Sequence, residues 1–193
     1  PRYTGPVEIG KSARFRATAL REGGENASYS REFAFSKSTG RPAVLNTKPN
    51  DSYTFEGASL LVDGYHSRPV FTSGAWLGYL DEPLDVTIDM GGEQSYRSVE
   101  LETLAEKGDW IFPPSSVTVW VSDNGTDFTE VASVTVPEAK AGDADGIGRY
   151  RMQFPETSAR YLKVVAQNAA AIPAWHPGAG SKGFLFVDEI VVE

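Results

Sequence analysis

Side chains that could serve as catalytic groups are few and scattered in this 193-residue sequence. It contains two histidines, His66 and His176, about 110 positions apart, and no cysteine. It has neither the Gly-x-Ser-x-Gly motif of serine hydrolases nor a phosphate-binding glycine loop. A glycosidase needs two carboxylates about 5–10 Å apart, and the candidates are Asp109 and the pair Asp188-Glu189. Asp109 lies in a glycine-containing loop, where Asp commonly forms turns, and the pair lies in an expected strand. We therefore predict that this chain is not an enzyme.

Aromatic side chains in loops offer a different chemistry, the binding of a sugar. The apolar face of a pyranose ring stacks on a flat aromatic group while neighbouring polar groups bind its hydroxyls. Trp110 ends the charged segment EKGDW, and Trp175-His176 lies in a second loop, over residues 168–182. We expect both loops at one end of the fold, with a ligand-binding set of Trp110, Glu106, Lys107, Asp109, Trp175 and His176. The alternative is that the apolar triplet of residues 110–112 folds inward as a plug, an interpretation favoured for Ile111 and Phe112.

A carboxylate beside a glycine-containing turn is a suitable anchor for calcium. This ion binds about six to eight oxygen atoms, several of which are backbone carbonyls. Asp63, directly before Gly64, fits this description. The alternative interpretation is that Asp63 caps the turn and that Glu189 pairs with Arg68, and the sequence leaves both open.

Alternation of apolar and polar residues indicates the elements that position these side chains. A period of two is typical of half-buried antiparallel strands, whereas no window of about 12 residues has helical spacing. The 19 Gly and 12 Pro supply the turns of an all-β fold, and Asp123-Asn124-Gly125 predicts a hairpin turn. We expect Trp120 on the face opposite Val117. The expected strands cover residues 14–19, 84–90, 117–121, 149–154, 162–166 and 185–192.

Charge is unevenly distributed along the chain. Residues 1–45 contain eight Lys or Arg and four Glu, a net charge of +4, so the total of −8 leaves −12 for the rest. This shift predicts a domain boundary near residues 45–51. The acidic part should repel phosphate backbones and anionic membranes, so we expect no nucleic-acid partner. No apolar run approaches the ~18 residues of a membrane helix, so we expect no membrane insertion. Because the sequence opens at Pro1 without a signal peptide, we expect a fragment of a longer protein.

Four segments carry a family resemblance when they are taken together: LLVDGYHS, GAWLGY, WIFPPSSVTVWVSDNGTDF and HPGAGSKGFLFVDEIVVE. They resemble the discoidin or F5/8 type C domain, in particular the one at the C-terminal end of some bacterial β-N-acetylhexosaminidases of glycoside hydrolase family 20. Residues 1–45, with YTGPV, KSARFRATA and SREFAF, are similar to part of the fibronectin-III-associated, chitobiase C-terminal-like β segment that precedes such domains.

The resemblance implies a fold and a metal site. The implied fold is all-β, a discoidin-like jelly-roll β-sandwich over residues 46–193 with a small β appendage, residues 1–45, packed on it. The resemblance also implies that Trp76 and Tyr79 lie in the core of the sandwich. A structural Ca²⁺ would be held by Asp63, Glu189 and the carbonyls of Leu60 and Tyr65. The loop HSRPVFTSG is longer than in the family, so the hydroxyl ligand could be Ser67, Thr72 or none.

Three function classes remain. The first is a non-catalytic carbohydrate-binding module of an exported bacterial glycosidase, periplasmic, cell-surface or secreted. It would bind a glycan containing N-acetylhexosamine or galactose and accompany an upstream catalytic domain of the same polypeptide. The second is a structural spacer, and the third is a protein-binding adhesion domain. Exposure of Trp110 and Trp175 would favour the first class, their burial the second, and a large exposed apolar patch the third.

Overall fold

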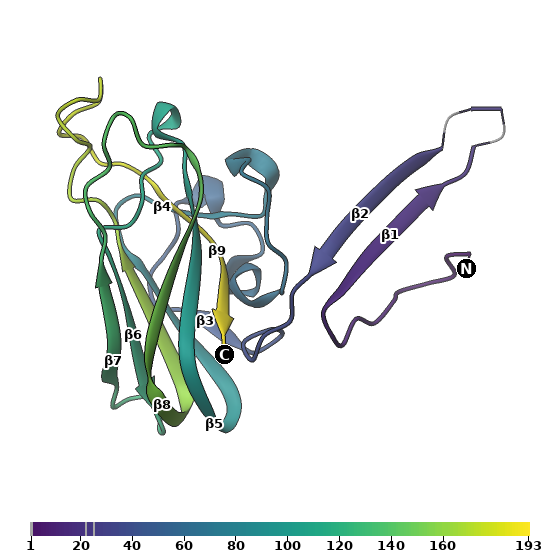
Figure 1. Ribbon diagram of the computed structural model, residues 1–193, viewed down its shortest axis with the longest axis horizontal. Helices are drawn as coiled ribbons and strands as arrows, with labels where there is room; N and C mark the ends of the chain where they lie inside the picture. The colour runs from purple at the N-terminus through teal and green to yellow at the C-terminus, as the bar shows by residue number, and fades with distance from the viewer. Residues whose placement is uncertain (1, 22, 25) are drawn as a thin grey trace.

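Almost all regular structure in the computed structural model is β-strand (Figure 1). The structure describes residues 2–21, 23–24 and 26–193. The strands are β1 (Ala13–Ala19), β2 (Ala27–Phe33), β3 (Ala43–Leu45), β4 (Leu77–Tyr79), β5 (Leu84–Ala105), β6 (Ser116–Ser122), β7 (Thr129–Thr135), β8 (Gly146–Gln167) and β9 (Leu185–Val192). Short 3-10 helices occupy η1 (Asp51–Tyr53), η2 (Gly57–Val62), η3 (Phe71–Ser73) and η4 (Lys107–Asp109). Within the described ranges, none of the helices has the length and apolar character needed to cross a membrane.

Two strands of 22 residues, β5 and β8, are shared by both layers of a β-sandwich. In one layer, the first half of β5 pairs with β3 and with the second half of β8. The same half of β8 also pairs with β6, and β6 pairs with β7. In the other layer, the second half of β5 pairs with β9 and with the first half of β8, and β4 pairs with β9. The β5–β8 register shifts between Asp89 and Gln94, where Gly91 has a φ of 79°. Glycine adopts this left-handed conformation without strain, and Gly91 lies where β5 passes from one layer to the other.

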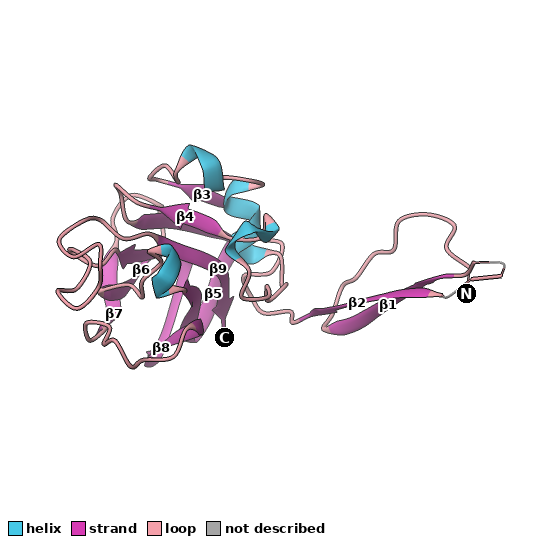
Figure 2. Cartoon of the chain, turned by 90° about the horizontal axis from the view of Figure 1, so that it is seen from above, coloured by secondary structure: helices cyan, strands magenta, loops and turns pink. Residues whose placement is uncertain are grey.

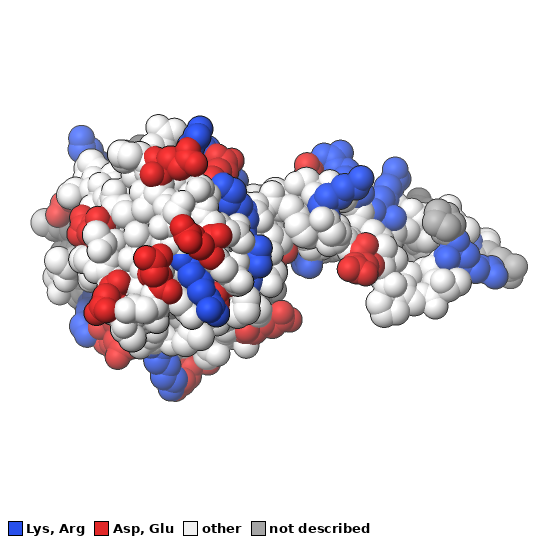
Figure 3. Space-filling model, turned by 90° about the horizontal axis from the view of Figure 1, so that it is seen from below, with Lys and Arg blue, Asp and Glu red and all other residues white. Residues whose placement is uncertain are grey.

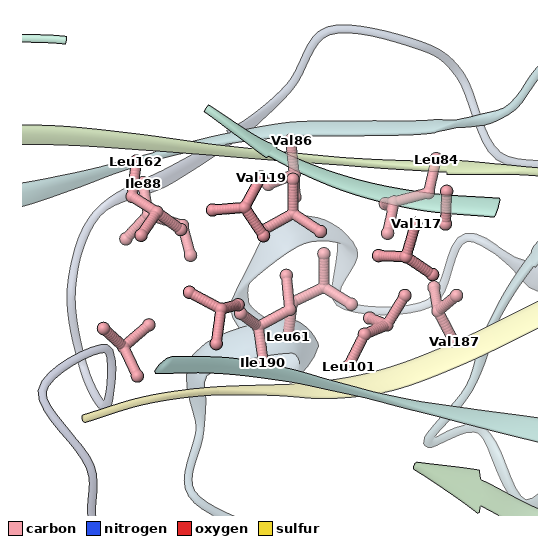
Figure 4. Close-up of a cluster of buried hydrophobic side chains, with 14 of the residues drawn as sticks. Leu61, Leu84, Val86, Ile88, Leu101, Val117, Val119, Leu162, Val187 and Ile190 are labelled. Atoms are coloured by element: carbon pink, nitrogen blue, oxygen red, sulfur yellow. The ribbon is translucent and has the colours of Figure 1, made fainter. Parts of the chain in front are cut away.

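The core lies between the two layers and contains the apolar residues of the alternating segments (Figure 4). Leu84, Val86 and Ile88 of β5 are completely buried, as are Val117 and Val119 of β6. η2 adds Leu61 from outside the sheet, and Figure 4 shows it beside Ile190 and Leu101. The predicted all-β fold, its period-two strands and the β-sandwich are therefore confirmed.

Three aromatic residues lie as the sequence predicts. Trp76 and Tyr79 are completely buried. Trp120 is half-buried on the face opposite Val117, and the Lys163 ammonium lies 5.4 Å from the centroid of its ring. Its cation–π contact with Lys163 stabilises the outer surface of this layer.

The β1–β2 hairpin forms a separate arm that projects from the side of the sandwich (Figures 1 and 2). Its base contacts the sandwich, since the Arg31 guanidinium lies 3.8 Å from the centroid of the Tyr65 ring. The appendage therefore does not pack along the sandwich as expected, because its strands pair with each other and extend away from the other sheet. Lys and Arg predominate on the arm in Figure 3, in agreement with the charge of residues 1–45.

Residues 34–45 belong to the sandwich and not to the arm. The Ser38 hydroxyl donates to the Ile190 carbonyl at 2.5 Å, and the Gly40 amide donates to the Val62 carbonyl at 2.7 Å. β3 then pairs with β5. The expected domain boundary at residue 45 thus falls at the end of β3, a strand of the sandwich. The chain passes from the arm to the sandwich near Ala34, whose amide donates to the Gly64 carbonyl.

Candidate ligand-binding site

One end of the sandwich carries both loops for which sugar binding was predicted, together with the β7–β8 loop (Figure 1). The first loop is a tight turn: the Glu106 and Ile111 amides each donate to the other's carbonyl at 3.1 Å. Inside this turn the Trp110 amide donates to the Lys107 carbonyl at 3.0 Å, and Trp110 has a φ of 64°. The Phe184 amide donates to the Trp110 carbonyl at 2.8 Å, which joins the turn to the segment before β9. These bonds fix Trp110 in an uncommon backbone conformation for a residue with a side chain.

Trp110 and Trp175 come from different loops and lie edge-on against the same imidazole, that of His176. The ring centroids of Trp110 and Trp175 are 6.0 and 5.6 Å from that of His176, with interplanar angles of 89° and 83°. The exposed fractions of the two tryptophans are 43% and 39%. The Trp175 indole N–H donates to the Ala139 carbonyl at 2.9 Å, which ties the β7–β8 loop to the same cluster. The result is a pair of ordered aromatic side chains that remain accessible to solvent.

His176 is a buried support of this cluster. Its Nδ1 accepts from the Gly178 amide at 3.0 Å, so Nε2 carries the proton and donates to the Lys107 carbonyl at 2.9 Å. Both ring nitrogens are occupied within the protein. His176 therefore orients the two tryptophans and does not present a nitrogen to a ligand.

Lys107 is also buried, and its ammonium bonds within the protein. Nζ donates to the Asp143 carbonyl at 2.8 Å and forms a salt bridge with the Asp145 carboxylate. The bond with Lys107 lowers the pKa of Asp145. The remaining predicted contacts, Glu106 and Asp109, lie on the turn itself, and partial burial followed by the charge of Asp109 raises the pKa of Glu106.

Ile111 and Phe112 are 1% exposed, in agreement with the plug interpretation for these two residues. The Phe112 ring also contacts the aromatic cluster, with its centroid 5.5 Å from His176 and 6.3 Å from Trp175. The triplet of residues 110–112 thus divides: Trp110 stays exposed while its two successors fill the end of the sandwich. Sequence reasoning did not identify Phe112 or Asp145 as parts of this end, although the acidic segment AGDAD that contains Asp145 is visible in the sequence.

The Asp-Gly turn lies elsewhere, against β9. Asp63 Oδ1 accepts from the Tyr65 amide at 2.7 Å, so Asp63 does cap this turn. Glu189 Oε2 accepts from the Gly64 amide at 3.2 Å, while Glu189 Oε1 is buried and has no hydrogen-bond partner within the part of the chain that the structure describes. Burial first, then the charges of Asp63 and Asp188, raises the pKa of Glu189 to about 10.

The two carboxylates at this turn, Asp63 and Glu189, are the type of ligand that a hard cation prefers. An unpartnered buried carboxylate oxygen needs either a proton or a cation, and burial also raises the pKa of Asp63. Across the described residues no group of three or more His, Cys, Asp or Glu is placed to hold a metal. Calcium also binds backbone carbonyl oxygens, however, and Leu60 and Tyr65 lie within a few residues of Asp63 in the chain. Of the two hydroxyl candidates, Ser67 donates to the Ala75 carbonyl at 3.3 Å, and Thr72 lies exposed in η3.

Neighbouring carboxylates hold the same loop, a role that the sequence did not predict. The Ser67 amide donates to Asp188 Oδ2 at 2.7 Å, and His66 Nδ1 lies 3.0 Å from Glu102 Oε2, which also accepts from Arg149 Nε at 2.8 Å. Asp188 and Glu189 are 1% and 0% exposed, so neither carboxylate of this candidate glycosidase pair is accessible to a substrate.

Comparison with known proteins finds a matching family model and solved structures with a similar fold. Residues 46–182 match the family model of the F5/8 type C domain. No curated protein sequence matches. The solved structures with a similar fold include chitosan-binding module 1 from a chitosanase/glucanase of Paenibacillus sp. IK-5, at 18% identity and a TM-score of 0.53, over 82% of this chain and 98% of that chain.

Two further structures share the fold. One is the CBM32-5 module from Clostridium perfringens in complex with GalNAc-β-1,3-galactose, at 16% identity and a TM-score of 0.51, over 78% of this chain and 93% of that chain. The other is a fucose-binding module of Streptococcus pneumoniae, at 21% identity and a TM-score of 0.50, over 82% of this chain and 94% of that chain.

Proposed function

The chain belongs to the F5/8 type C domain family, and from this premise we propose that it is a non-catalytic carbohydrate-binding module that binds a glycan at the Trp110–Trp175 end. One observation carries the proposal. Two tryptophans from separate loops are held edge-on against a single buried imidazole, yet about two fifths of each remains exposed. Large aromatic side chains are normally buried in the interior, so an ordered and exposed pair is a surface suited to stacking.

The competing spacer function predicts that both tryptophans are buried. Phe112, which contacts the same aromatic cluster, is buried at this end, with an exposed fraction of 1%. The exposure of Trp110 and Trp175 therefore favours a ligand-binding surface over a sealed end of the sandwich.

Each predicted residue has a distinct part in this proposal. Trp110 provides the stacking surface and Trp175 a second aromatic wall, while Glu106 and Asp109 at the rim accept hydrogen bonds from sugar hydroxyls. His176 and Lys107 hold the two loops in place, because their polar atoms bond within the protein. The similar modules from Clostridium and Streptococcus are described with galactose-containing and fucose ligands, which supports a glycan as the ligand class.

The parent protein in this proposal is an exported bacterial glycoside hydrolase, with β-N-acetylhexosaminidase as the favoured activity and catalysis in another domain. The support is the resemblance of residues 1–45 and 46–193 to the C-terminal part of such enzymes. We further propose a structural Ca²⁺ held by Asp63, Glu189 and the carbonyls of Leu60 and Tyr65. This ion would neutralise the buried Glu189 carboxylate and stabilise the loop that follows the Asp-Gly turn.

Titration calorimetry of the intact chain with N-acetylglucosamine, galactose and their short oligomers tests the binding function. A single shallow site predicts a Kd between about micromolar and millimolar. Trp110→Ala should abolish binding, whereas Tyr29→Ala, which removes an exposed ring on the arm, should leave it unchanged. Absence of binding by any sugar at millimolar concentration would leave the spacer function as the better account.

A further inference from the structure

An apolar groove lies beside Trp175 at the same end of the sandwich. Three segments line it, residues 112–115, 136–139 and 169–174, and it encloses about 350 Å³. Ser115 and Glu138 are its polar residues, and the rest of its lining is apolar. Sites for small ligands occupy about 300–1,000 Å³, so this volume is sufficient for one small group.

Small side chains leave this groove open to solvent. Residues 169–171 are three consecutive alanines, and Ala171 and Ala174 are exposed. Ile172 between them is buried, with an exposed fraction of 2%. Apolar surface in contact with water is unfavourable, so a ligand that covers the groove with apolar atoms gains the free energy of removing both surfaces from water.

The polar groups around the groove form hydrogen bonds within the protein. The Ser115 hydroxyl donates to the Asn168 carbonyl at 2.8 Å, and the Ser115 amide donates to the Gln167 carbonyl at 2.8 Å. The Val136 amide donates to the Ser115 carbonyl at 2.8 Å. A pyranose ring in the groove would find few partners for its hydroxyls, and a buried hydroxyl without a partner costs free energy. The groove therefore suits an apolar group better than a second sugar unit.

The groove and the candidate sugar site share a wall. The Trp175 indole N–H donates to the carbonyl of Ala139, which lines the groove. Phe112 also lines it, and the centroid of its ring lies 6.3 Å from that of Trp175. Ala174, the residue before Trp175, is a third lining residue. A group attached to a sugar at Trp175 can therefore extend into the groove.

We propose that this end binds amphiphilic glycosides, in which the sugar stacks at Trp110 and Trp175 and an alkyl chain linked to it lies in the apolar groove. The inference rests on the proposed function, since it adds a second part to the ligand of the same site. Three observations support it: the apolar lining, the internal bonding of the nearby polar groups, and the wall shared with Trp175.

The test is a series of glycosides that differ in chain length. The methyl, butyl and hexyl β-glycosides of galactose and of N-acetylglucosamine are titrated into the intact chain below their micellar concentrations. Full burial of one methylene gives about a fourfold gain in affinity, and a groove open on one side should give about twofold. The hexyl glycoside has five more methylenes than the methyl glycoside, so it should bind about thirtyfold more tightly.

The outcomes of this series separate the inference from the proposed function. Equal affinity of the methyl and hexyl glycosides would overturn the inference while leaving the proposed function in place. Absence of binding by every glycoside of the series would overturn both.

Matched variants locate the alkyl chain. Ala171→Glu places a charge in the groove, and Ala19→Glu places the same charge at an exposed position of the arm. Ala171→Glu should abolish the dependence on chain length, because an alkyl chain would desolvate the carboxylate. It should leave the affinity for the methyl glycoside within about twofold, since Trp110 and Trp175 are unchanged. If Ala171→Glu keeps the dependence, or if both variants lose it equally, the chain does not lie in the groove.

Two further measurements distinguish other occupants of the groove. Hexanol lacks the sugar and should bind at least about tenfold more weakly than the hexyl glycoside, and equal affinity would overturn the inference that one ligand occupies both sites. In sedimentation velocity the chain should be a monomer. A dimer that Ala171→Glu dissociates would assign the groove to a second copy of the chain and would also overturn the inference.

Discussion

Gly178 is the residue against which the Trp110 ring packs, and it offers a way to move the ring without removing it. A Cβ at position 178 would lie 2.8 Å from Cζ2 and 2.9 Å from Cη2 of Trp110. Ordinary contacts between carbon atoms are about 3.5–4.0 Å, so Gly178→Ala must displace the rigid indole by roughly 1 Å. A radial gap of this size forfeits about a quarter to a half of a van der Waals contact. We expect sugar affinity to fall about fivefold, or about 1 kcal/mol.

The same substitution should lower the free energy of unfolding by only about 1–3 kcal/mol, the usual cost of overpacking, so the protein stays folded. The backbone at residue 178 is not in the left-handed region, so alanine is allowed there and restricts the unfolded chain. Gly142→Ala is the matched control, because its Cβ would meet nothing within 4 Å and the residue lies in the neighbouring loop. Calorimetry gives the affinities, and the indole N–H resonances in an NMR spectrum report the displacement of Trp110. Unchanged affinity together with a shifted Trp110 resonance would refute the claim that the position of this ring determines binding.

Three other perturbations probe the rest of the chain. Phe112→Ala should lower the free energy of unfolding by about 3–5 kcal/mol, since it removes a buried ring, and a urea titration in which it costs no more than Trp110→Ala would contradict this. The hydrogen bond with Arg160 lowers the pKa of Asp89 to about 2 from 3.8. The ionised Asp89 carboxylate therefore stabilises the folded state above about pH 4, and this contribution is lost as the pH falls through 2. The difference in unfolding free energy between wild type and Arg160→Gln should shrink over this window, and a constant difference would count against the pair. Calcium at a hundredfold excess over its Kd should stabilise the native state by about 2.7 kcal/mol. The calcium site would be refuted if millimolar Ca²⁺, added after chelation, left the melting temperature unchanged or raised it equally in Glu189→Gln.

The strands were predictable because each buries one face. Leu84, Val86 and Ile88 alternate with polar residues, and this pattern is sufficient to place them in the core. The continuation of β5 through Gly91 was not predictable, since adjacent glycines usually mark the end of a strand and here permit a bend. The placement of the arm relative to the sandwich was not predictable for a related reason. Its alternation identifies strands, but nothing in a local pattern states which surface, if any, a hairpin packs against.

At the candidate site, the sequence predicted that the two loops lie at one end of the fold, but not the state of each side chain. Trp110 is exposed and Phe112 buried, although both belong to one apolar triplet, because the φ of 64° at Trp110 turns it away from the interior. The burial of Lys107 depends on Asp145, 38 residues further along the chain. The occupation of both His176 nitrogens depends on the meeting of two loops. Such contacts are properties of the tertiary structure and leave no local pattern.

The sharing of β5 and β8 between the two layers has a consequence for how the chain reaches its native state. Neither layer can form alone, because each contains half of both strands, and their pairing joins Leu84 to Ala166. The hydrogen bond from Ser38 to Ile190 spans 152 positions. A topology dominated by such distant partners has a high contact order, which predicts folding in milliseconds to seconds rather than microseconds. During synthesis the sandwich cannot close until β9 has left the ribosome, so until then the buried face of β5 is exposed to chaperones and to neighbouring nascent chains.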